Sequence, residues 1–128
     1  MKRSDDEILK RLRQACGLLA GNSETVTFGH PTFQVNGKTY AVLEEYKGEL
    51  SICFRVEKSL QDVFLDDPRF YRTPYIGKHG WVSLKVHAAP LDWNEIGQLL
   101  AGSRDLVAAQ AGQRRKKAGR RRTKTGSG

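Results

Sequence analysis

The sequence lacks any long apolar run. No segment approaches the ~20 consecutive apolar residues that a membrane-spanning helix requires, and the charged N-terminus has no signal-peptide core. We therefore expect a cytoplasmic protein.

Cysteine is scarce, with two residues in the chain. Cys16 falls on an apolar helix face and Cys53 in a strand-like run, with no CxxC spacing and no nearby set of Cys and His ligands. We expect both thiols to be reduced and structural, and we expect no metal site.

Motifs of catalysis and cofactor binding are missing as well. There is no GxSxG, Walker loop or dinucleotide glycine fingerprint, and Glu44 and Glu45 are strand neighbours that point to opposite faces. We expect no enzyme and no cofactor. Lys78 and His79 are the residues to test for catalysis, although a solvated hairpin tip is the simpler interpretation. The histidines are scattered along the chain at His30, His79 and His87.

Acidic residues are absent from residues 114–128, which hold eight of the 22 Lys and Arg residues. The remaining 14 basic residues balance the 14 acidic ones in residues 1–113. Such a tail repels itself, so we predict that it stays disordered until it meets a polyanion, with nucleic acid as its favoured partner. A solubilising role or binding to other polyanions is the alternative. The tail's basic residues are Arg114, Arg115, Lys116, Lys117, Arg120, Arg121, Arg122 and Lys124.

Residues 1–113 suit one domain, and its first half is patterned as a helix followed by a meander. Ser4 and Glu7 form a capping box before apolar residues at helical spacing, and Gly21 stops the helix. Asn36-Gly37 is a hairpin signal between strands 32–35 and 38–46. A third strand alternates over residues 50–56.

The second half predicts a short helix, a hairpin and C-terminal helices. Ser59 and Asp62 begin the short helix, whose residues Leu60, Val63 and Phe64 are expected to face the core. The hairpin joins residues 75–76 to 81–87 through a turn at 77–80. Asp92 and Glu95 cap a helix that Gly102 closes, before a last helix over 104–110. The fold class is α/β (α+β).

Nearly the whole body resembles the MmcQ/YjbR family of small bacterial proteins. The resemblance rests on residues 31–33 (PTF), 36–38 (NGK), 74–82 (PYIGKHGWV), 91–93 (LDW) and 106–107 (LV). It implies a secretion-chaperone-like fold, also compared with frataxin, and a double-wing mode of DNA binding. Hairpin tips would then act as wings, which nominates Lys38, Lys47, Lys78 and His79.

Aromatic residues allow two interpretations. Trp81, Trp93, Phe33, Tyr75 and Tyr40 could stack on unpaired bases, but core packing is favoured for both tryptophans. In residues 69–72, Arg69 and Arg72 flank Phe70 and Tyr71 and could grip a partner. Alternatively, Phe70 lies on the core and the arginines are solvated.

Two functions of different class remain open. The first is a DNA-binding protein whose hairpin tips orient the body while the basic tail contacts phosphates, without sequence specificity from the tail itself. The second is a protein-interaction or chaperone-like adaptor that pairs through an open sheet edge.

Overall fold

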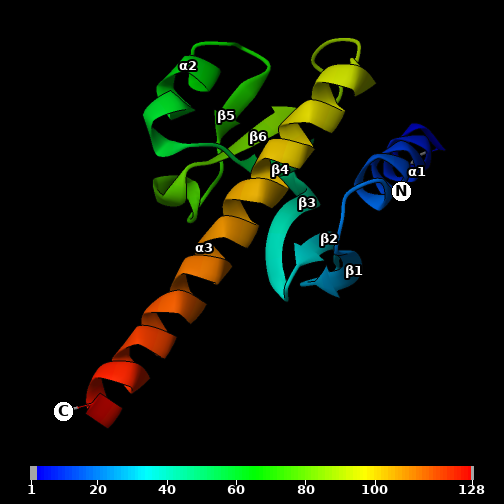
Figure 1. Cartoon of the computed structure of the whole chain (residues 1–128). Helices are drawn as coiled ribbons and strands as arrows, with labels where there is room; N and C mark the ends of the chain where they lie inside the picture. Colours follow the sequence, from blue (N-terminus) through cyan, green and yellow to red (C-terminus); the bar gives the residue numbers. More distant parts are fainter. Residues whose placement is uncertain (1–2, 128) are drawn as a thin grey trace.

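A six-stranded antiparallel sheet carries two long helices. The computed structural model describes residues 3–127, with the side chains of residues 4–110. The strand order is β1-β2-β3-β4-β6-β5 (Figure 1). The α/β (α+β) class is confirmed. The elements are α1 Arg3–Gly17, β1 Asn22–Thr27, β2 His30–Val35, β3 Lys38–Tyr46, β4 Glu49–Arg55, the 3-10 turn η1 Lys58–Leu60, α2 Gln61–Leu65, β5 Phe70–Arg72, the 3-10 turn η2 Gly77–His79, β6 Trp81–Lys85 and α3 Trp93–Ser127.

Two-residue turns connect the first four strands. At the predicted hairpin, Asn36 and Gly37 have φ of 53° and 74°, the left-handed pair that a tight turn between twisted strands requires. Phe28-Gly29 and Lys47-Gly48 have the same signs of φ and the same position between strands. The predicted three-stranded meander is therefore corrected to four strands, because β1 precedes it.

The second predicted hairpin has a different first strand. Residues 70–72 form β5, which pairs with β6 through Phe70 opposite Leu84 and Arg72 opposite Val82. The predicted strand at residues 75–76 is wrong, since those residues belong to an irregular segment that contains η2. We call residues 73–80 the β5–β6 loop.

The predicted inward face of α2 is wrong in part. Phe64 packs against the core, but 47% of Leu60 and 67% of Val63 is exposed. The buried position is Gln61, whose amide donates hydrogen bonds to the carbonyls of Gly77 (2.6 Å) and Trp81 (3.1 Å). A polar residue thus connects α2 to the β5–β6 loop.

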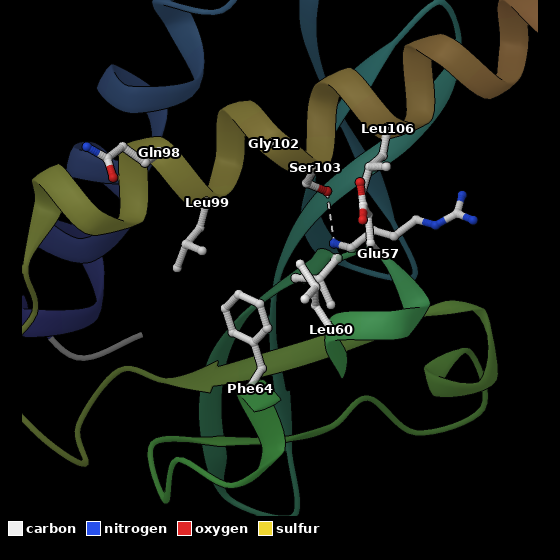
Figure 2. A pocket seen from close by; sticks show the side chains of 10 residues that line it. Glu57, Leu60, Phe64, Gln98, Leu99, Gly102, Ser103 and Leu106 are labelled. Carbon is white, nitrogen blue, oxygen red and sulfur yellow. Dashed lines mark hydrogen bonds between the residues drawn. The ribbon is translucent and has the colours of Figure 1, made fainter. Parts of the chain in front are cut away.

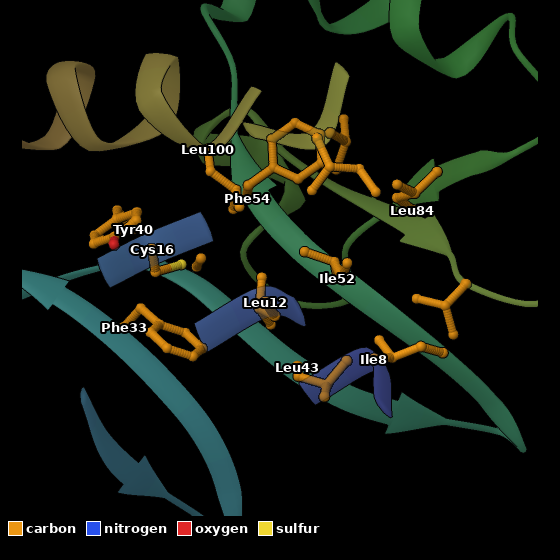
Figure 3. Close-up of a cluster of buried hydrophobic side chains, with 14 of the residues drawn as sticks. Ile8, Leu12, Cys16, Phe33, Tyr40, Leu43, Ile52, Phe54, Leu84 and Leu100 are labelled. Carbon is orange, nitrogen blue, oxygen red and sulfur yellow. The ribbon is translucent and has the colours of Figure 1, made fainter. Parts of the chain in front are cut away.

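The core lies between the sheet and the two long helices. Leu12 and Cys16 from α1 pack among Phe33, Leu43 and Ile52 of the sheet (Figure 3). Ile96, Leu100 and Val107 of α3 join the same cluster. Within residues 3–127, no helix combines the length and apolarity needed to cross a membrane.

Of the two N-caps predicted for α1 and α3, one is present in the structure. Asp92 caps α3 as predicted, because its Oδ1 accepts the N–H groups of Asn94 (3.0 Å) and Glu95 (3.3 Å). In α1, the helix begins at Arg3, so Ser4 lies inside it and not at the predicted cap.

One uninterrupted helix replaces the two predicted at the C-terminus. Gly102 lies inside α3, and the Ser103 hydroxyl bonds to the sheet, donating to the Tyr40 carbonyl (2.6 Å) and accepting from the Arg55 N–H (2.8 Å). The helical backbone continues to Ser127 and projects beyond the sheet (Figure 1). The predicted disorder of residues 114–128 stays a prediction, because the side chains of residues 111–128 lie outside the described part.

Candidate nucleic-acid interface

Strand direction gathers basic residues at one end of the sheet. At this end the β2–β3 turn reverses the chain, Arg55 finishes β4 opposite Trp81, and Arg72 lies next to the end of the β5–β6 ladder. We call it the basic end. Its candidate contact residues are Lys38, Arg55, Lys58, Arg72, Lys78 and His79.

Most of these side chains face solvent. Lys38, Lys58 and Lys78 are exposed, while Arg55 is half-buried and its guanidinium donates to the Gln110 amide oxygen. Glu57 is an acidic residue at the same end. The basic end therefore carries a net positive charge on a surface that a polyanion can reach.

An open hollow adjoins the basic end, between α3 and the η1–α2 segment. It has a volume of about 200 Å³ and is mostly apolar (Figure 2). Arg55 and Glu57 lie at its edge, and the Ser103 hydroxyl bonds to the Arg55 N–H beside it. Its apolar lining includes Leu60, Phe64, Leu99 and Leu106.

The opposite end of the sheet, which we call the acidic end, holds Glu45, Glu49 and Asp5 together with the cations Lys47 and Lys85. Lys47 lies there in the β3–β4 turn between Glu45 and Glu49, with its Nζ 5.4 Å from the Tyr46 ring centre. Asp5 pairs with His87 at 3.0 Å near this end. Because β3 separates them, Lys47 and Lys38 are roughly 25–30 Å apart. The four nominated wing residues thus divide: Lys38, Lys78 and His79 share the basic end, whereas Lys47 does not.

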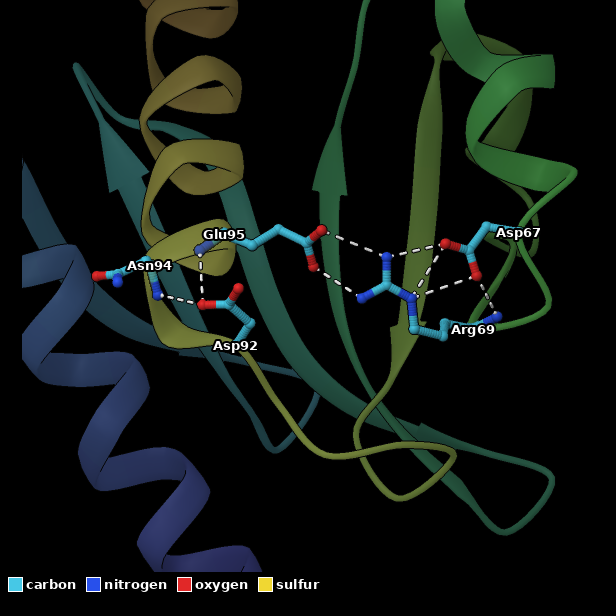
Figure 4. A network of polar contacts seen from close by, with 5 residues as sticks. All are labelled: Asp67, Arg69, Asp92, Asn94 and Glu95. Carbon is cyan, nitrogen blue, oxygen red and sulfur yellow. Dashed lines mark hydrogen bonds and ion pairs between the residues drawn. The ribbon is translucent and has the colours of Figure 1, made fainter.

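Arg69 is held by two carboxylates (Figure 4). Its guanidinium lies 2.8 Å from Asp67 Oδ2 and 2.7 Å from Glu95 Oε1. Hydrogen bonds that Arg69 donates to Asp67 lower the pKa of Asp67, and its hydrogen bonds to Asp67 and Glu95 raise the pKa of Arg69. A phosphate would have to displace both carboxylates, so the geometry disfavours Arg69 as a phosphate ligand.

The aromatic residues do not form a shared platform. Phe33, Tyr40 and Trp81 are buried, and Trp93 packs partly on the core beneath the Arg11 guanidinium. Core packing of both tryptophans is confirmed. Tyr75 is the exception, at 91% exposed.

Residues 69–72 combine both of the interpretations left open. Phe70 is buried and packs edge-on against Phe54 and Phe64. Arg69 is ion-paired, while Arg72 is exposed at the basic end. The segment is therefore a core strand with one outward cation.

Among residues 4–110, the thiols and the histidines come from separate parts of the fold. Burial raises the pKa of the Cys16 thiol to about 11 and that of Cys53 to about 12. Both thiols are free. His79 and His87 lie at opposite ends of β6. Among the described residues, no group of three or more His, Cys, Asp or Glu could hold a metal ion.

Sequence reasoning missed Arg55 and Lys58 and could not group the other cations. The available signal was their position, with Arg55 near the end of the alternating strand and Lys58 just after it, where side chains reach the end of the sheet. The nominated tail residues, Arg114, Arg115, Lys116, Lys117, Arg120, Arg121, Arg122 and Lys124, have side chains outside the described residues.

Comparisons with known proteins agree with this architecture. A protein from Pseudomonas syringae is 18% identical, with a TM-score of 0.65 over 84% of this chain and 99% of its own. The Deinococcus radiodurans protein DR2400, with family-model domain DUF419, is 20% identical, with a TM-score of 0.63 over 74% of each chain. These likenesses concern the fold. No curated protein matches the chain. The YjbR family model matches residues 18–106, and the chain therefore belongs to the YjbR family.

Proposed function

We propose that this protein binds nucleic acid, DNA in the first instance, through the basic end of its sheet together with the basic C-terminal segment of α3. One observation carries the proposal: both cationic elements lie on the same side of the molecule. α3 passes the basic end at Ser103, which bonds to β3 and β4, and its backbone then continues away from the sheet (Figure 1). The protein acts by binding, without catalysis.

The two elements have different roles in this proposal. Residues 114–128 supply strong attraction to phosphates without reading sequence. Lys38 begins β3, while Lys58 and Lys78 lie in the 3-10 turns η1 and η2 beside the sheet. These lysines belong to the folded body, so they orient it on the polymer. The double-wing arrangement is therefore modified here, because Lys47 lies too far away to join the same contact.

A salt titration tests the tail's role. Duplex DNA binding by the full chain should fall with salt along a logarithmic slope near ~5 if about six phosphates are neutralised. That slope amounts to about a thousandfold loss between ~50 and ~200 mM salt. Removal of residues 114–128 should abolish most of the affinity and flatten the slope. Unchanged affinity after the deletion would refute the proposal.

Matched lysine variants test the role of the body. Lys38→Gln and Lys78→Gln should each weaken duplex binding and reduce the salt slope by about 1, because each removes one phosphate contact. Lys47→Gln is the control, since it removes the same charge from another hairpin turn at the acidic end. Equal losses for all three variants would contradict binding through the basic end.

A second candidate function follows from the sheet edge. β1 is exposed along nearly its whole length, including 68% of Val26, and its outer backbone is available for pairing with an added strand. A protein-interaction module of this kind would still bind its protein partners after nuclease treatment. A Val26→Lys variant should lose those partners while retaining nucleic-acid binding.

A further inference from the structure

Tyr75 combines exposure with an unfavourable backbone. Its side chain is 91% exposed, and its φ of 67° lies in the left-handed region that an L-residue with a large side chain rarely adopts. Because the ring is exposed, its packing contributes little to the stability of the fold. A strained residue of this kind points to a role outside folding.

The β5–β6 loop holds Tyr75 in place. The Gly77 N–H donates to the Thr73 carbonyl (2.8 Å), which closes a turn around Tyr75. Buried Gln61 binds the Gly77 carbonyl from below (2.6 Å). Gly80 lies against the Val56 carbonyl with no room for a Cβ. Because its surroundings are fixed, the aromatic ring is presented from a rigid support.

Basic residues flank Tyr75 in the chain. Arg72 precedes the loop, and its side chain lies against the Gly77 backbone. Lys78 and His79 follow Tyr75 in η2, and both are exposed. A ligand that matches a flat apolar ring among positive charges has an aromatic face and negative charge, which is the chemistry of a nucleotide.

We propose that Tyr75 stacks on an unpaired base, so that this protein prefers single-stranded nucleic acid, or strands with unpaired ends, over a regular duplex. The inference rests on the proposed nucleic-acid binding. In a duplex both faces of each base are covered by neighbouring pairs, whereas a single strand can offer a free face to the ring. Stacking on an aromatic side chain tolerates any base, so the preference concerns strandedness and not sequence.

The full chain and its Tyr75→Ala variant test the stacking. The probes are a single-stranded oligonucleotide with 2-aminopurine at its centre and the same oligonucleotide annealed to its complement. Tyr75→Ala should weaken single-strand binding by about 5- to 150-fold and abolish the quenching of 2-aminopurine. Duplex affinity and salt slope should stay unchanged. Tyr75→Phe should keep both single-strand affinity and quenching.

Phe28 offers a matched control. It is also an exposed aromatic residue with positive φ, at 95% and 52°, but it lies in the β1–β2 turn at the acidic end. Phe28→Ala should leave binding to both probes unchanged. Thermal unfolding of each variant confirms that it is folded.

The outcomes separate the two proposals. If the full chain binds both probes with salt-dependent affinity and Tyr75→Ala behaves like the parent, only the stacking inference is overturned. Equal single-strand losses in Phe28→Ala and Tyr75→Ala would also overturn it. If the full chain binds neither probe at low salt, the proposed function and this inference both fail.

Discussion

Gly80 lies so close to Val56 that a Cβ at residue 80 would come within 2.5 Å of the Val56 carbonyl oxygen. The two residues also share a backbone hydrogen bond, from the Val56 N–H to the Gly80 carbonyl (2.9 Å). This contact joins the end of β4 to the start of β6 and fixes the position of the β5–β6 loop.

Gly80→Ala should destabilise the protein strongly. Its φ of 93° already costs an L-residue about 1–2 kcal/mol, and the clash with backbone adds to that cost. Gly29→Ala is the control, because Gly29 has a φ of 81° with open space around it. Urea denaturation should show a larger loss in free energy of unfolding for Gly80→Ala. Equal losses would show that the loop moves away from Val56.

Gly102→Ala should stabilise the protein by about 0.5–1 kcal/mol. Gly102 lies inside a continuous helix, and a Cβ there meets open space. Chemical denaturation of the two proteins measures the difference. A loss of stability would instead favour a helix that ends at this glycine, as the sequence pattern predicts.

Asp67→Asn should destabilise the protein at neutral pH and matter less in acid. Hydrogen bonds from Arg69 hold the pKa of Asp67 below its usual value, so the folded state binds this proton less readily than the unfolded state. The stabilisation is therefore complete above about pH 4 and disappears as pH falls through the lower, folded-state pKa. The free energies of unfolding of the parent and of Asp67→Asn should therefore approach each other in acid, and urea denaturation from pH 7 down to pH 2.5 measures both.

Asp66→Asn is the control for Asp67→Asn. Asp66 is the neighbouring, exposed carboxylate. A difference between parent and Asp67→Asn that stays constant with pH would contradict stabilisation by the ionised carboxylate.

Both thiols should resist modification in the folded protein. Burial raises the pKa of Cys16 to about 11 and that of Cys53 to about 12, so little thiolate exists at pH 8. A colorimetric disulfide reagent should react slowly with the native protein and rapidly with two thiols in guanidinium chloride. Rapid reaction without denaturant would show that the sheet opens readily.

Local sequence signals predicted the central part of the fold well. Asn36-Gly37 specifies a turn with positive φ at two successive positions. The alternation in residues 50–56 identifies a strand, but the single buried face that it predicts is wrong, because Ser51 and Cys53 on the other face are buried as well. β1 was not predicted from the sequence, because nearly all its residues are exposed and no alternation of apolar and polar residues marks it. Phe28-Gly29, a turn of the same kind, was the available signal.

Features that depend on tertiary contacts could not be predicted. β5 has three residues, too few for a periodic pattern, and its pairing with β6 spans an irregular loop. At Gly102 the local preference for a helix end is overridden, because Leu100, Ser103 and Val107 all pack inward along one helix. The candidate interface depends on strand order and direction, which bring Lys38 and Lys78 to the same end.

The separation of charge along the strands has a physical consequence for how this protein would meet a polyanion. Residues 1–113 carry no net charge, so a distant polymer exerts little overall pull on them. The polymer does exert a torque on the body, since cations predominate at one end of the sheet and most of the carboxylates named above lie at the other. The body would rotate as it approaches and present Tyr75 and Lys78 before first contact. This rotation would increase the fraction of encounters that begin in a productive orientation.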